Sequence, residues 1–119
     1  MRGTSVGAEH FSLSIQAPSP VLVGKSATAT IVLAAKSPFH CNEKYPYKFK
    51  LDAPGPGVSY PSSLARGMSV RGAHGSMGVP FSGRQPGRAT VSGTLYMSVC
   101  SADQCMMDRR HLAVSVQIQ

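Results

Sequence analysis

Tryptophan is absent from the 119-residue chain, and acidic residues are scarce, with five Asp and Glu against twelve Lys and Arg. Charged residues make up only 14% of the chain and hydrophobic residues 42%. This balance excludes a disordered, charge-rich tail, because the apolar side chains suffice to build a core. No apolar run approaches the roughly 18–20 residues that a membrane-spanning helix needs. We therefore expect one globular domain, with no membrane span in this chain.

The formal charge of +7 favours solubility and a weak affinity for anionic surfaces. The Lys and Arg residues are scattered, without the basic run or aromatic-interleaved basic motif that is typical of nucleic-acid binding. We predict a monomer that binds no nucleic acid. Residues 1–5 lack the apolar segment of a secretory signal, which by itself does not assign the protein to the cytoplasm.

Long helices are excluded by twelve Gly and nine Pro, which interrupt the chain at short intervals. The dominant hydrophobic period is two residues, the pattern of strands with one buried face. This pattern predicts an all-β fold, an immunoglobulin-like antiparallel β-sandwich of about seven or eight strands. The strand segments are 10–16, 27–35, 45–51, 58–60, 68–71, 77–81, 88–100 and 111–119.

Residues 1–8 precede the first strand pattern, and we expect them to form a flexible N-terminal tail. Residues 9–119 then form a single domain. Its last two strands are expected to form a hairpin whose apolar residues share one core face. These residues are Val91, Leu95, Met97 and Val99 on one strand and Leu112, Val114, Val116 and Ile118 on the other.

Three cysteines are too few for a disulfide-stapled mini-protein. If residues 101–104 form the hairpin loop, Cys100 and Cys105 face each other across the two strands. Directly opposed Cβ atoms lie about 4.5–5.5 Å apart, which a disulfide spans with modest twist. The strand period places Cys100 on the face opposite Val99, so we expect an exposed pair that points away from the core. Cys41 belongs to a distant segment and is expected to stay free.

Three roles remain open for this pair. Closing a loop of about six residues removes only ~2 kcal/mol of unfolded-state freedom, which makes the pair a poor structural staple and favours a reducible couple. Alternatively, Cys100, Cys105 and Met107 offer the soft sulfur ligands that select Cu(I). Met106 and Met107 also suit partial core packing or an apolar contact with a protein partner. The third role is an incidental structural disulfide.

The segment 39–47 contains the remaining cysteine in the sequence FHCNEKYPY. Cys41 is either a small buried residue or, with His40 beside it, a nucleophile or a third ligand. Tyr45 and Tyr47 are expected in the core or at its rim. No paired carboxylates indicate hydrolytic acid–base chemistry. No Gly-rich phosphate loop precedes a helix, and we expect no cofactor.

Two segments together resemble a known family. Residues 91–107, VSGTLYMSVCSADQCMM, are similar to the end of the N-terminal periplasmic domain of the thiol–disulfide interchange protein DsbD. Residues 39–54, FHCNEKYPYKFKLDAP, are similar to the His-x-Asn and Tyr-Pro segment of DsbD-like domains, which also occur alone. An aromatic cap loop over the pair is not evident.

The resemblance implies an immunoglobulin-like sandwich whose last hairpin carries a redox-active pair, Cys100 and Cys105. It also implies a periplasmic or extracellular location and electron transfer with a thioredoxin-like protein, an activity of the thiol–disulfide oxidoreductase class. Cys105 is then the attacking thiol, since DsbD-like domains use the second cysteine. The basic residues Arg109 and Arg110 follow it in the chain, and cations close to a thiol favour its thiolate.

Overall fold

Strands are the regular element of the computed structural model, which describes residues 2–119, and no segment of these residues is helical. The all-β prediction is therefore confirmed, and the described residues contain no helix that could cross a membrane. Eight strands match predicted segments: β2 (Phe11–Ala17), β3 (Ser26–Ala35), β5 (Lys48–Leu51), β6 (Val58–Ser59), β8 (Ser69–Arg71), β9 (His74–Gly83), β10 (Gly87–Cys100) and β11 (Cys105–Ile118). Three more were not predicted: β1 (Arg2–Gly7), β4 (His40–Cys41) and β7 (Leu64–Arg66).

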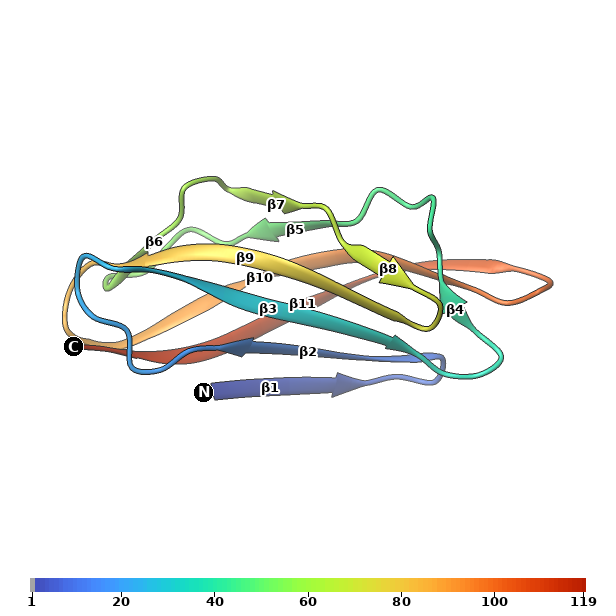
Figure 1. Cartoon of the computed structure of the whole chain (residues 1–119), viewed down its shortest axis with the longest axis horizontal. Coiled ribbons are helices and arrows are strands. Elements are labelled where there is room, and N and C mark those ends of the chain that lie inside the picture. The colour runs from blue at the N-terminus through green and yellow to red at the C-terminus, as the bar shows by residue number, and fades with distance from the viewer. Residues whose placement is uncertain (1) are drawn as a thin grey trace.

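These strands form two sheets that pack as a β-sandwich, and every pairing between them is antiparallel (Figure 1). One sheet has the order β1-β2-β3-β9-β6, with β8 also paired to β9, and the other has the order β11-β10-β5-β7, with β4 also paired to β10. Each sheet turns an apolar face inward, because alternate side chains point to opposite faces. The largest fully buried side chains include Leu13, Ile15, Ile31, Leu33, Phe49, Met77, Phe81, Leu95, Met97 and Leu112.

The predicted N-terminal tail is instead largely a strand. Strand β1 pairs with β2 from Arg2 opposite Ala17 to Gly7 opposite Ser12. It also reaches the second sheet, where the Thr4 hydroxyl donates a hydrogen bond of 2.6 Å to a carbonyl of β11. This segment is held by backbone pairing along β2 and not by burial of alternate side chains. Its residues therefore show little of the apolar alternation that marks the other strands. Met1 lies outside the described residues.

The longest hairpin connects β10 and β11, each of fourteen residues. Its register runs from Gly87 opposite Ile118 to Cys100 opposite Cys105. The loop 101–104 is closed by a hydrogen bond of 2.8 Å from the Ser101 N–H to the Gln104 carbonyl, and the hairpin projects beyond the other strands at one end (Figure 1). All eight predicted core residues of these strands are buried: Val91, Leu95, Met97, Val99, Leu112, Val114, Val116 and Ile118.

Gly93 of β10 marks the tightest approach between this hairpin and β5. A Cβ atom at this position would lie 2.5 Å from the Lys50 carbonyl oxygen and 2.9 Å from the Phe49 ring. We expect Gly93→Ala to destabilise the domain by about 1–3 kcal/mol, because a backbone atom and a core ring must both move. Urea denaturation followed by circular dichroism measures this loss. Gly7→Ala is the control, since nothing lies within 4 Å of its Cβ position, and equal stabilities of the two variants would contradict the packing.

Candidate functional site

A disulfide joins the two strands of the last hairpin at its tip. Cys100 and Cys105 are bonded with an S–S distance of 2.07 Å and a Cα–Cα distance of 4.0 Å. They end β10 and begin β11 in direct opposition, as the four-residue loop predicts. Cys41 is free and buried. The predicted pairing is therefore confirmed, and it is set by the hairpin register.

The two bonded cysteines differ in exposure. Cys100 follows Tyr96 and Ser98 on the outer face of β10, opposite the core residues Met97 and Val99, and it does not belong to the hydrophobic core. It is nevertheless only 6% exposed, whereas Cys105 is exposed. The expectation of an exposed pair is thus correct for Cys105 and wrong for Cys100.

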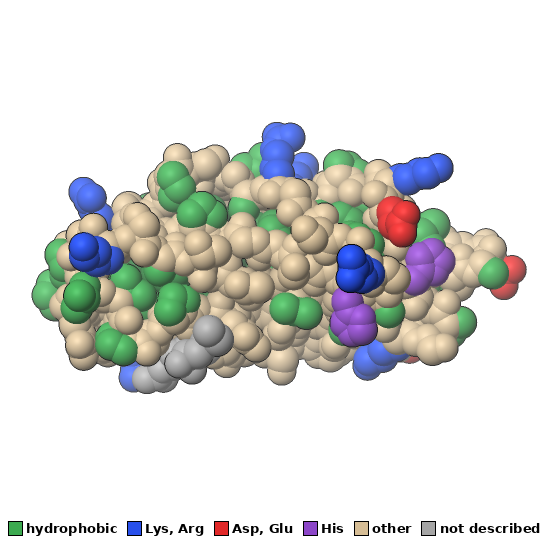
Figure 2. Space-filling view, in the orientation of Figure 1, with side chains coloured by type: hydrophobic (Ala, Val, Ile, Leu, Met, Phe, Trp, Pro, Cys, Tyr) green, Lys and Arg blue, Asp and Glu red, His purple; other side chains and the backbone are tan. Residues whose placement is uncertain are grey.

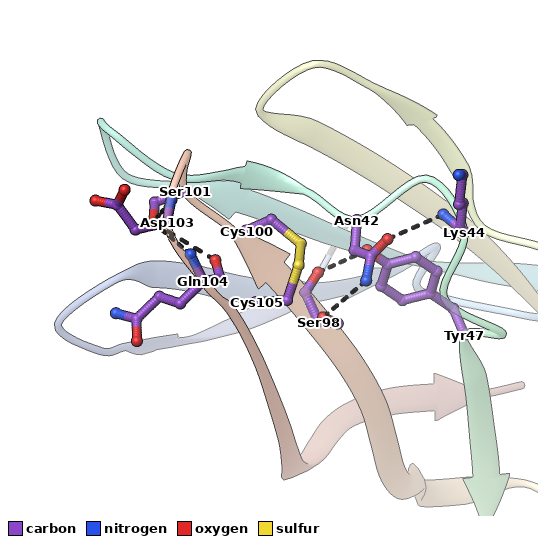
Figure 3. The surroundings of a disulfide bond; sticks show 9 residues. All are labelled: Asn42, Lys44, Tyr47, Ser98, Cys100, Ser101, Asp103, Gln104 and Cys105. Atoms are coloured by element: carbon purple, nitrogen blue, oxygen red, sulfur yellow. Dashed lines mark hydrogen bonds between the residues drawn. A yellow bond between two sulfur atoms is a disulfide. The ribbon is translucent and has the colours of Figure 1, made fainter.

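The segment that follows β4 is hydrogen-bonded to the same end of β10, two residues before Cys100. The backbone N–H of Asn42 donates to the Ser98 carbonyl at 3.1 Å, and the Asn42 side-chain amide donates to the Ser98 hydroxyl at 3.2 Å. The Tyr47 hydroxyl donates to the same Ser98 carbonyl at 2.7 Å. Figure 3 shows these groups beside the disulfide. Residues 42–47 therefore lie against this end of β10, a contact that no local sequence pattern indicates, and we call them the covering segment.

Two buried ionisable groups, one in the covering segment and one in β4, stay neutral. Burial raises the pKa of the Tyr47 phenol far above its ordinary value, and the neighbouring Cys41 raises it further. Burial also raises the pKa of the Cys41 thiol. Cys41 pairs with Val99 and belongs to the core, on the side of the sheet opposite Cys100. These facts argue against Cys41 as a nucleophile or ligand and favour the buried structural role.

His40 is a further residue of the site, and its position follows from the register. It lies directly opposite Cys100 in the β4–β10 ladder and is exposed. The sequence had associated it with its neighbour Cys41, because no local spacing shows which residue of β10 it meets. Met107, two residues after Cys105, is 76% exposed and Met106 is 37% exposed. Of their expected roles, the exposed apolar contact therefore fits better than core packing.

Two basic residues that follow Cys105 in β11, Arg110 and His111, each contact a carboxylate. Arg110 forms an ion pair with Asp108 at 3.0 Å and lies over the Phe11 ring at 5.5 Å. His111 contacts Asp52 at 2.8 Å, and this contact, with a hydrogen bond from a serine hydroxyl, lowers the pKa of that carboxyl group. Both side chains are thus paired with carboxylates and not with Cys105.

No group of three or more His, Cys, Asp and Glu side chains among residues 2–119 is arranged to hold a metal ion. The sulfur set that the sequence suggested for Cu(I), with Cys100, Cys105 and Met107, has two members in the disulfide. That set is available only after reduction, since thiolates are the ligands. Met107 lies on the face of Cys105, as the strand period predicts.

Comparison with known proteins adds no assignment: no protein-family model matches the chain, and no curated protein matches it. The candidate function therefore rests on the geometry of the hairpin and on its chemistry.

The buried Tyr47 hydroxyl offers a test of the covering segment. We expect Tyr47→Phe to cost about 1 kcal/mol through the lost hydrogen bond, and Tyr47→Ala to cost about 3–5 kcal/mol through the cavity. Tyr47→Ala should also speed reduction of the disulfide by dithiothreitol, because the covering segment loses its bond to Ser98, two residues before Cys100. Denaturation and thiol-release kinetics measure both effects. Tyr60→Phe is the control, since its bond to the Thr90 carbonyl is long, at 3.4 Å, and exposed; an equal cost would contradict the assignment.

Proposed function

We propose that this protein is a thiol–disulfide exchange domain that transfers electrons to or from a thioredoxin-like protein through Cys100 and Cys105. The observation that carries this proposal is the unequal exposure of a disulfide at a hairpin tip. Cys105 is open to a partner, and Cys100 is covered but bonded to it. An exchange reaction needs this division, because one sulfur must meet the partner and the other must complete the reaction within the domain.

The contribution of the disulfide to stability supports the same proposal. Strands β10 and β11 are paired at fourteen positions, of which only the last involves the cysteines. Closing so short a loop contributes at most ~2 kcal/mol by the chain-entropy argument. A structural role alone therefore explains little of this pair, whereas a solvent-facing sulfur is what exchange requires.

The reaction takes two balanced steps. In the reduced domain, the Cys105 thiolate attacks one sulfur of the partner disulfide, and the other partner sulfur leaves as a thiolate. Cys100 then attacks Cys105, which re-forms the domain disulfide and releases the second partner thiolate. The two protons of the domain thiols pass to the partner thiolates, and two electrons move to the partner. The same steps in reverse reduce the domain.

The surroundings of the pair suit these steps. The covering segment holds the end of β10 through Ser98, so Cys100 stays beside Cys105 after reduction. His40 lies directly opposite Cys100 and adds an exposed imidazole to the surroundings of the pair. A disulfide of this kind persists in an oxidising compartment, which supports a periplasmic or extracellular location and agrees with the resemblance to DsbD-like domains.

Single-cysteine variants test the assignment of roles. We expect Cys100→Ser to accumulate a mixed disulfide between Cys105 and an oxidised thioredoxin, because the resolving thiol is missing. Cys105→Ser should form this adduct about tenfold more slowly, since the remaining thiol is buried. Non-reducing electrophoresis and mass spectrometry identify the adduct. Faster trapping by Cys105→Ser would reverse the roles, and a wild-type disulfide that resists reduction by every thiol would refute the exchange function.

A second candidate, binding of Cu(I) by the reduced hairpin, is favoured by one observation. Met107 is largely exposed on the face that carries Cys105, so a thioether lies beside two thiols once the disulfide is reduced. Soft sulfur ligands of this kind select Cu(I).

Competition with a chromogenic Cu(I) chelator distinguishes this candidate from exchange. If Cu(I) is the ligand, the reduced protein should compete with the chelator, and both the oxidised protein and Cys100→Ser should fail to do so. Met107→Leu should weaken binding. Met68→Leu should not, because Met68 lies in the connection between β7 and β8. Equal competition by the reduced and oxidised proteins would exclude a site on the cysteines.

A further inference from the structure

An open groove lies beside the disulfide hairpin, on the outer face of the β10 sheet. Its cavity volume is about 720 Å³. A smaller hollow of about 310 Å³ shares two of its tyrosines and continues along β11 toward the cysteines. We call the two together the tyrosine groove. Its charged lining residues are Lys48, Arg66 and Arg109 and the carboxylates Glu43 and Asp108, and its tyrosines are Tyr45, Tyr47 and Tyr96.

Two cations on the rim of the tyrosine groove lie in an unfavourable arrangement. Lys48 is directly opposite Arg66 in the β5–β7 ladder, and like charges in this position destabilise a sheet. The Lys48 ammonium lies 4.9 Å from the centre of the Tyr96 ring. Glu43 also lines the groove, but among residues 2–119 no carboxylate lies within 4.0 Å of either cation. The sheet therefore holds two positive charges without a carboxylate partner, beside the half-buried rings of Tyr45 and Tyr96.

The molecule as a whole also carries a net positive charge. The chain carries +7, and Figure 2 shows Lys and Arg side chains at both ends and along the upper edge of the visible face, with Asp and Glu side chains toward the end where the β10–β11 hairpin projects. Tyrosine and arginine are the residues enriched at the centres of protein interfaces. A negatively charged protein surface complements this groove in both charge and chemistry.

We propose that the tyrosine groove docks an acidic surface segment of the thioredoxin-like partner and thereby sets which partners exchange with Cys105. This inference rests on the proposed exchange function. Met107 joins the groove to the reactive hairpin, because it is two residues from Cys105 and lines the smaller hollow. A segment seated between the two cations holds the partner beside the exposed sulfur.

The position of the cations separates docking from a direct effect on the sulfur. Lys48 lies opposite Tyr96, which precedes Cys100 by four residues, or roughly 13 Å along an extended strand. The Debye length at physiological ionic strength is about 8 Å, so these charges act weakly on the Cys105 sulfur. They should therefore change the rate with a charged partner and leave the rate with a small neutral thiol unchanged.

Two synthetic dithiol peptides provide the probes. Each contains Cys-Gly-Pro-Cys, preceded in one by four Glu and in the other by four Gln. Stopped-flow kinetics measures reduction of the oxidised full-length chain by each reduced peptide, and by dithiothreitol. At physiological ionic strength we expect the Glu peptide to react about tenfold faster than the Gln peptide, with an advantage that declines as more salt is added.

Charge-reversal variants locate the effect on the molecule. Lys48→Glu with Arg66→Glu should abolish the advantage of the Glu peptide. Arg84→Glu with Arg88→Glu makes the same change in net charge at the opposite end of β10, and it should retain most of the advantage. If the charge reversal disturbs folding, Lys48→Gln with Arg66→Gln serves as a milder test. This pair should give an intermediate ratio of the two peptide rates. Equal rates for the two peptides, or equal losses in the two charge-reversal variants, would overturn the groove as the docking site.

Peptides with both cysteines replaced by serine separate docking from exchange. Their binding is measured by fluorescence anisotropy and should show the same preference for Glu and the same dependence on Lys48 and Arg66. Failure of this binding, with normal reduction by dithiothreitol, refutes the docking inference alone. Binding with a disulfide that no thiol reduces refutes the exchange function instead.

Discussion

The antiparallel pairing of β10 with β11 is the constraint on which the rest of the structure depends. One continuous register places the apolar residues of both strands in the core and brings Cys100 opposite Cys105. The same β10 strand pairs with β5 and β4 on its other edge. The second sheet is therefore organised around one strand, and a shift of its register by one residue would expose the core and separate the cysteines.

The outer face of this strand explains how a β-sandwich presents a reactive group without exposing all of it. Side chains at every second position of β10 point away from the core. Cys100 occupies such a position, so its strand alone would leave it open to water. Hydrogen bonds from Asn42 and Tyr47 to Ser98 bring a distant segment over that end of the strand. The result is one buried and one exposed cysteine in the same disulfide, the arrangement from which both proposals start.

Stability and recognition make different demands on the same sheet. The core residues stabilise the sheet by burial, and glycine at position 93 permits close contact with β5. The opposition of Lys48 and Arg66 contributes no such benefit, because like charges repel and no carboxylate of the described residues lies within 4.0 Å of them. Such a pair is understandable where a partner supplies the missing negative charge, and its place beside the tyrosines is consistent with that role.

The sequence by itself determined the features that depend on neighbouring residues. Period-two alternation identified eight strands and the core face of the last hairpin, because burial of one sheet face leaves that pattern, and the short loop identified the cysteine pair. It did not indicate β1, which is held by backbone pairing with β2, or the burial of Cys100, because Asn42 lies 56 residues from Ser98. The meeting of His40 with Cys100 and of Lys48 with Arg66 also required the fold. Alternation shows which side chains leave the core, and only the tertiary structure decides what they then meet.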